Sequence, residues 1–171
     1  MNTAVLSTLL GRTIDDAASV IKQGWQGTRP FMTGCLINTD DVFSICTGTV
    51  VDIGQDNKNN LYSVTIEYNY STWIRYCLLQ FYEVAVGDQV VVGTKIGTTY
   101  KGVLRFEYCS DTFSVFPYRQ GTRQLYKHDP MPVLTGEIAL PEVDDSGDIL
   151  AIGEDDFMVY VDEDTSDGEV E

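Results

Sequence analysis

The chain has 171 residues, 43% of them hydrophobic and 22% charged, so it is long enough for one globular domain and too apolar to be disordered throughout. Its net charge of −15 is unevenly placed: residues 1–136 hold 11 Lys+Arg and 12 Asp+Glu, whereas residues 137–171 hold 14 Asp+Glu and no Lys or Arg. This distribution, with no basic stripe, argues against nucleic acid and against anionic membrane surfaces as partners.

The cysteines and the first residues indicate the compartment. Cys35, Cys46, Cys77 and Cys109 form no Cys-x-x-Cys pair and have no histidine at zinc-finger spacing, which predicts reduced, buried thiols. The N-terminus lacks a basic stretch, and no run approaches the ~18 apolar residues that a membrane span needs. We therefore expect neither a signal peptide nor a transmembrane helix, and synthesis and folding in a cytoplasm.

The N-terminal residues have a helical pattern. Residues 2–26 place apolar side chains three and four positions apart, which predicts an amphipathic helix, or two short helices divided near Gly11–Thr13. The helix can pack on its own domain or dock on a neighbouring subunit, and the pattern does not decide between these. Glycines and a proline follow it, so we assign a helical segment to residues 1–28.

From Phe31 onward the apolar pattern changes to a period of two, which is typical of β-strands. Strands are expected at residues 42–45, 49–53, 61–70, 72–79, 84–86, 90–92, 95–97 and 103–108, with a polar loop at 54–60 and a hairpin turn near 69–71. Many short strands separated by glycine turns predict an all-β sandwich or barrel. We assign this mainly β domain to residues 29–136.

Four segments resemble, in order and spacing, the lysostaphin-like (LytM-type) zinc endopeptidases of peptidoglycan. They are Arg29 with residues 32–36 (Met-Thr-Gly-Cys-Leu), residues 41–50, residues 76–79 (Tyr-Cys-Leu-Leu) and residues 103–107 (Val-Leu-Arg-Phe-Glu), and residues 84–97 keep a Val-x-Val-Gly-Asp-x-Val-x-x-Gly-x-x-Ile-Gly pattern between them. The resemblance implies a barrel-sandwich-hybrid β domain. Biotinyl- and lipoyl-carrier domains share that glycine pattern, but Lys58, Lys95 and Lys101 lack the flanking residues of a carrier lysine.

The same resemblance places zinc ligands at Met32, Leu36 and Arg105 and a catalytic histidine at Leu78. A catalytic zinc needs nitrogen or oxygen ligands and an open position for water, whereas these residues offer a thioether, a hydrocarbon and a permanent cation. The only histidine, His128, lies outside the resemblance. We therefore expect no catalytic residues, no metal site, no cofactor and no enzymatic activity.

Other candidate sites are weaker. Aromatic residues could form a sugar-stacking surface, although in strands they more often build a core and cross-strand pairs; they are Tyr68, Tyr70, Trp73, Tyr76 and Tyr82. Residues 144–148 hold oxygen donors but lack the glutamate that ends an EF-hand loop, so we expect a solvated acidic turn.

Acid/base and nucleophilic chemistry also find little support. Glu83, Asp88 and Glu107 make no convincing acid/base pair, because Asp88 sits in a turn that the fold itself requires. An active enzyme with different chemistry would need a nucleophile with a base, and Cys77, beside Leu78, is the least implausible nucleophile without a base in evidence.

The acidic C-terminal arm, residues 137–171, sets short apolar runs among Asp and Glu. Apolar side chains are costly to leave in water, so such a segment either becomes ordered against a protein partner or folds back on its own domain.

Together these features predict a non-catalytic structural or adaptor subunit of a bacteriophage tail, baseplate or tail tip, located in the virion and synthesised in the host cytoplasm. Its partners would be other subunits, phage tail proteins above all, with at most a weak peptidoglycan contact. The alternative is a regulatory pseudopeptidase that binds a cell-wall hydrolase or peptidoglycan. We also expect Arg105→Ala to destabilise the fold if Arg105 pairs with a carboxylate such as Glu107 or an acid of the arm.

Overall fold

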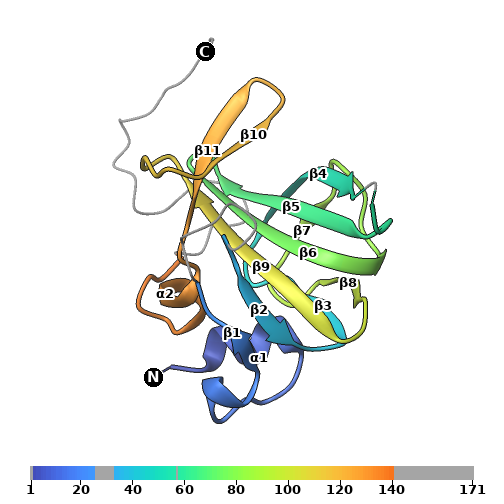
Figure 1. Cartoon of the computed structure of the whole chain (residues 1–171), viewed down its shortest axis with the longest axis vertical. Helices are drawn as coiled ribbons and strands as arrows, with labels where there is room; N and C mark the ends of the chain where they lie inside the picture. Colours follow the sequence, from blue (N-terminus) through green and yellow to red (C-terminus); the bar gives the residue numbers. More distant parts are fainter. Residues whose placement is uncertain (1, 26–32, 57, 141–171) are drawn as a thin grey trace. The chain divides into compact units, whose positions relative to one another are not determined.

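The structure, a computed structural model, describes residues 2–25, 33–56 and 58–140 (Figure 1). The helices and strands described below belong to one compact unit, Met1–Ala139. The acidic turn predicted at 144–148 and the apolar runs of the acidic arm lie outside the described residues.

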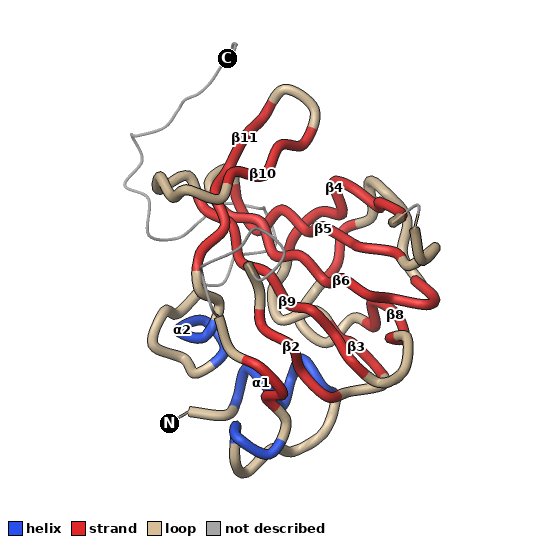
Figure 2. Tube along the Cα trace, viewed as in Figure 1, coloured by secondary structure: helices blue, strands red, loops and turns tan. Residues whose placement is uncertain are grey.

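The described chain is mainly β, as the sequence predicts (Figure 2). In chain order the elements are α1 (Ala4–Leu10), the 3₁₀ helix η1 (Ala17–Ser19), β1 (Ile21–Gln23), β2 (Cys35–Asn38), β3 (Asp41–Phe43), β4 (Gly48–Gln55), β5 (Tyr62–Asn69), β6 (Thr72–Tyr82), β7 (Gln89–Val90), β8 (Lys95–Thr99), β9 (Val103–Ser110), β10 (Pro117–Gln120), β11 (Arg123–His128) and α2 (Met131–Leu134).

The strands pair antiparallel in the order β1-β2-β9-β6-β5-β4-β7. Strand β11 pairs with the last residues of β9 and forms a hairpin with β10, which stands out from the sheet at the upper end of Figure 1. Strand β6 is shared: its residues up to Cys77 pair with β9, and those from Leu79 onward pair with β8. Between them Leu78 has a left-handed φ of 71° and marks the bulge at which β6 changes partner.

The predicted N-terminal helix is confirmed in its first half only. Helix α1 ends at Gly11, which takes φ 71° and donates its N–H to the last turn, a conformation that glycine adopts at little cost. Its apolar side chains Leu6, Leu9 and Leu10 are buried, so α1 packs on its own domain. The alternative of two short helices divided near Gly11–Thr13 is closer, since the 3₁₀ helix η1 follows α1. A helix over residues 21–23 is wrong, because Ile21–Gln23 forms the edge strand β1 and gains main-chain hydrogen bonds to β2.

Most predicted strands are confirmed, from residues 42–45 (β3) to residues 103–108 (β9), as is the hairpin between β5 and β6. The strand predicted at 84–86 is wrong: the side chain of Asp88 accepts a hydrogen bond from the Ala85 N–H (2.9 Å), which holds this stretch in a turn. Strands β1, β2, β10 and β11 and helix α2 were not predicted.

The β9–β6 pair is buried on both faces: a small cluster of Trp73, Cys109 and Leu125 lies on one face, and a second set of buried side chains packs on the other. Leu104 and Phe106 of β9 and Ile74 and Tyr76 of β6 are fully buried, and the Phe106 and Tyr76 rings meet edge to face with centroids 5.7 Å apart. The four cysteines are buried and free, which confirms the prediction of reduced thiols.

Candidate functional site

Strand register brings together the positions that the resemblance assigns to the zinc site. Leu36 of β2 and Cys77 of β6 both pair with Arg105, one on each side of β9. Leu78, the expected catalytic position, follows Cys77 at the bulge of β6. Met32 lies outside the described residues. Paired residues project from the same face of a sheet, so Leu36, Arg105 and Cys77 share the face opposite the Phe106 core.

A buried ion pair lies beside these positions. Glu107 follows Arg105 on the same face of β9, and its side chain is 1% exposed. Its partner is the guanidinium of Arg75 on β6, which donates to Glu107 Oε1 and is itself almost fully buried. Arg75 also donates to the hydroxyls of Thr65 (3.1 Å) and Ser63 (3.3 Å), and its Cζ lies 4.0 Å from the ring centroid of Tyr118. Arg75 therefore has a full set of partners, as a buried cation requires.

Two further cations approach the other oxygen of the same carboxylate. Arg105 Nε lies 3.2 Å and Lys127 Nζ 3.4 Å from Glu107 Oε2. The lysine makes a hydrogen bond, whereas the Arg105 Nε is close but misaligned and has no hydrogen-bond partner among the described residues. We call Arg75, Arg105, Lys127 and Glu107 the ionic cluster. The pairing of Arg105 with Glu107, one of the two arrangements considered from sequence, is confirmed.

The cluster sets the charge state of Glu107. Burial by itself would raise the pKa of this carboxyl, but the positive charges of Arg75, Lys127 and Arg105 outweigh burial, and the pKa is lowered. Glu107 is therefore a charged structural partner at neutral pH. The other two acids considered from sequence lie elsewhere: Glu83 pairs with Lys95 (3.2 Å), and Asp88 holds its turn.

The donor chemistry of this face does not suit a divalent metal. Leu36 offers no donor atom, and the guanidinium of Arg105 is a permanent cation. No group of three or more His, Cys, Asp or Glu that could hold a metal ion occurs among the described residues. His128, at the end of β11, contacts the carbonyl oxygen of Thr112 (2.8 Å) and the ring of Tyr108.

Cys77 is a poor nucleophile despite its place beside Arg105. Its side chain is 2% exposed, and burial raises the pKa of its thiol although Arg75 and Arg105 act to lower it. Cysteine attacks as the thiolate, and the thiolate is disfavoured here.

The aromatic residues considered for sugar stacking do not form one surface. Tyr68, Trp73 and Tyr76 are buried, as the core interpretation requires. Tyr70 and Tyr82 are exposed but separately placed: Tyr70 lies under the guanidinium of Arg123 (3.8 Å to the ring centroid), whereas Tyr82 contacts Tyr62.

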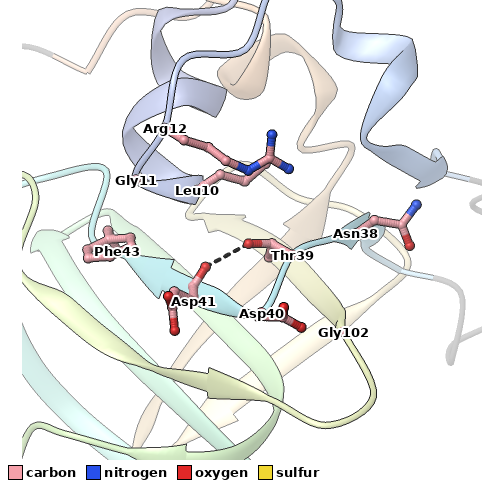
Figure 3. A pocket seen from close by; sticks show the side chains of 9 residues that line it. All are labelled: Leu10, Gly11, Arg12, Asn38, Thr39, Asp40, Asp41, Phe43 and Gly102. Carbon is pink, nitrogen blue, oxygen red and sulfur yellow. Dashed lines mark hydrogen bonds between the residues drawn. The ribbon is translucent and has the colours of Figure 1, made fainter.

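A polar cleft of about 460 Å³ lies near the start of β9, between the end of α1 and the β2–β3 turn (Figure 3). Arg12, Asp40 and Asp41 line it, and Thr39 Oγ1 donates to the carbonyl oxygen of Asp41 across 2.7 Å. Of the zinc and catalytic positions of the resemblance, the described ones, Leu36, Leu78 and Arg105, do not line this cleft.

Sequence reasoning missed Arg75 and Lys127. Arg75 had a signal: it stands between Ile74 and Tyr76 in a strand predicted to be buried, where a charge demands a partner. Lys127 had none, because the β10–β11 hairpin that carries it was not predicted.

Solved peptidase structures share this fold. The antimicrobial peptidase lysostaphin from Staphylococcus simulans has 26% sequence identity over 68% of this chain and 49% of that chain, with a TM-score of 0.53. A solution structure of lysostaphin gives 21% identity over 71% of this chain and 56% of that chain, with a TM-score of 0.52. This chain thus spans about half the length of the lysostaphin structures it matches.

A third match is the catalytic domain of a prophage-encoded M23 protein from Enterococcus faecalis, with 14% identity over 68% of this chain and 93% of that domain, and a TM-score of 0.50. No protein-family model matches the sequence, and no curated protein matches it. The fold is therefore lysostaphin-like, as the resemblance implied.

Proposed function

We propose that the chain is a non-catalytic structural or adaptor subunit of a bacteriophage tail, baseplate or tail tip, built on a peptidase-like fold that has lost its zinc site. The carrying observation is Arg105: a permanent cation, ion-paired with buried Glu107, stands where the resemblance places a zinc ligand. A positive side chain repels a divalent ion, and the facing Leu36 has no atom to offer one.

Metal analysis tests the loss of the zinc site. The full chain is purified after growth in zinc, and its bound metal is measured by mass spectrometry. The matched control carries Met32→His, Leu36→Asp and Arg105→His, which return donor atoms to the three ligand positions. We expect no stoichiometric zinc in the natural chain and uptake by the control. Stoichiometric zinc in the natural chain would return it to the metallopeptidases.

The assembly role is supported by analogy with where the fold occurs. A virion must meet peptidoglycan, the substrate of this class of peptidase, and one structural neighbour is prophage-encoded. The described residues include no helix with the length and apolarity needed to cross a bilayer. In this proposal the protein is located in the virion, and its partners are other phage tail proteins.

Fractionation tests that role against the alternative, a regulatory pseudopeptidase bound to a cell-wall hydrolase or to peptidoglycan. An epitope-tagged full chain is produced in phage-infected cells, and virions purified on a density gradient are compared with isolated cell-wall sacculi. We expect the tag at fixed stoichiometry in virions. Tag in sacculi or with a hydrolase, and absent from virions, would favour the pseudopeptidase.

A further inference from the structure

The ionic cluster holds more positive than negative charge. Arg75, Arg105 and Lys127 all approach the single carboxylate of Glu107, so three cations share one anion. Burying a cation without a counter-charge costs several kcal/mol. If the charge of Glu107 is assigned to Arg75, the charges of Arg105 and Lys127 remain and need either water or another anion.

Exposure identifies which of the cations could meet an outside anion. The side chain of Arg105 is 31% exposed and that of Lys127 is 16%, whereas Arg75 is only 9% exposed. Arg75 already has two hydroxyls, the carboxylate and an aromatic ring as partners. Arg105 and Lys127 are therefore the cations of the cluster that an anion from outside can reach.

The surroundings of Arg105 leave its guanidinium unsatisfied. A guanidinium has five N–H donors in a planar fork. Arg105 makes no hydrogen bond among the described residues: its buried Nε lies 3.2 Å from Glu107 Oε2, an ion pair without hydrogen-bond alignment. Its cross-strand neighbours are Leu36, which cannot accept, and Cys77, whose sulfur is a weak acceptor. Apart from the ion pair with Glu107, the described strands give this guanidinium fork no hydrogen-bond acceptor.

Arg105 and Lys127 are close enough to act on one ligand. Both lie within 3.4 Å of the same oxygen, Glu107 Oε2. A planar fork with an ammonium group beside it matches a carboxylate, which binds arginine through two parallel hydrogen bonds.

We propose that Arg105 and Lys127 form a binding site for a carboxylate side chain of an acidic protein segment. A nucleic acid fits less well, because residues 1–136 hold 11 Lys+Arg against 12 Asp+Glu, and two cations are too few to follow a phosphate backbone. This inference does not depend on the phage role, and its success or failure leaves the metal and fractionation tests unaffected.

Nuclear magnetic resonance of the isotope-labelled full chain tests the site, because the Nε–H of Arg105 gives its own signal. The probe is a capped peptide of alternating glutamate and serine, and its control replaces each glutamate with glutamine. We expect the glutamate peptide to shift the Arg105 signal saturably and the glutamine peptide to leave it in place. A signal that moves with neither peptide, or equally with both, would overturn the proposal.

Variants establish which cations bind. Arg105→Lys removes the fork and keeps the charge, and Lys127→Met removes the ammonium group. Each is expected to weaken binding about tenfold, the usual value of a charge-assisted hydrogen bond. Arg119→Met makes the same charge change as Lys127→Met at an exposed hairpin residue and should change affinity less than about twofold. An equal loss at Arg119 would show diffuse charge attraction and contradict a defined site.

Small anions separate the remaining sources of a carboxylate or phosphate. Acetate and inorganic phosphate are titrated separately while the Arg105 signal is followed. Peptide binding at much lower concentration than acetate supports a protein segment. Equal concentrations would indicate a small-carboxylate site, and tighter phosphate binding would indicate a phosphate site, and either result would overturn the assignment.

Discussion

Phe106 and Glu107 are neighbours on β9, and both side chains are buried. They point to opposite faces of the sheet: Phe106 is held by apolar packing and Glu107 by ion pairs. On the Phe106 face, close packing with Tyr76 excludes water. On the Glu107 face, a charge is buried and must be matched by cations from other strands. The fold is lysostaphin-like although Leu36 and Arg105, where the resemblance places metal ligands, offer no donor suited to a metal ion. The Phe106 face is thus held by apolar packing, whereas the Glu107 face also depends on matched charges.

The largest loss of stability is expected from a substitution on the Phe106 face. Phe106→Ala leaves a cavity among fully buried side chains and should lower the free energy of unfolding by about 3–5 kcal/mol. Because no charge is involved, the loss should be equal at pH 7 and pH 4 in urea unfolding. Phe81→Ala is the control, since Phe81 is 61% exposed and should cost no more than about 0.5 kcal/mol. A small loss at Phe106 would contradict the role given to that face.

The second largest effect is expected from Glu107→Gln, which should lower the free energy of unfolding by about 3 kcal/mol at pH 7. The substitution leaves three cations around a neutral group. Its effect should depend on pH. The pKa of Glu107 is lowered in the folded state, so the carboxylate stabilises the fold above its ordinary value of 4.5 and this contribution is lost as pH falls below it.

The test of that dependence is urea unfolding of the natural chain and of Glu107→Gln from pH 7 to pH 3. The difference between them should narrow below pH 4.5. Glu83→Gln removes a half-exposed partner of Lys95 and should cost less than about 1 kcal/mol. A difference that stays constant with pH would show that Glu107 acts by shape and not by charge.

The two arginines sharpen the comparison within the charged face. Arg75→Ala should cost about 2–3 kcal/mol, since it removes the hydrogen bonds to Glu107, Thr65 and Ser63. Arg105→Ala should cost only about 1 kcal/mol, because Arg105 makes an ion pair without a hydrogen bond and leaves Glu107 with two cations. Chemical unfolding ranks them, and a greater loss at Arg105 would mean that it, and not Arg75, neutralises Glu107.

The smallest effect is expected from thiol reagents on the native protein. All four cysteines are buried, and burial raises the pKa of Cys35, Cys46 and Cys109 to about 12 and raises that of Cys77 as well. Little labelling is therefore expected at pH 8 before unfolding, and four thiols afterwards. Rapid labelling of Cys77 in the native protein would contradict the conclusion that it is a poor nucleophile.

Sequence reasoning succeeded where the pattern was local. Strand β5 alternates apolar and polar residues along its whole length, and β6 and β9 are rich in β-branched, aromatic and other apolar residues, so local pattern and composition located them. It failed at β1, where three residues gain strand structure only by pairing with β2, and at the β10–β11 hairpin, whose residues are mostly polar and partly exposed. Short edge strands owe their conformation to a neighbour and not to their own pattern.

The charged face shows the same division. By itself the sequence determined a mainly β lysostaphin-like fold, because the order and spacing of the motifs can be read directly from it. It also determined that the side chain of Arg105 cannot hold zinc, because donor chemistry follows from residue type. Only the tertiary structure decided that Arg75 and Lys127 join Arg105 around Glu107, since Arg75 lies 32 positions and Lys127 20 positions from that carboxylate. The reason is physical: a buried charge selects its partners by distance in space, and strand register, not sequence spacing, sets that distance.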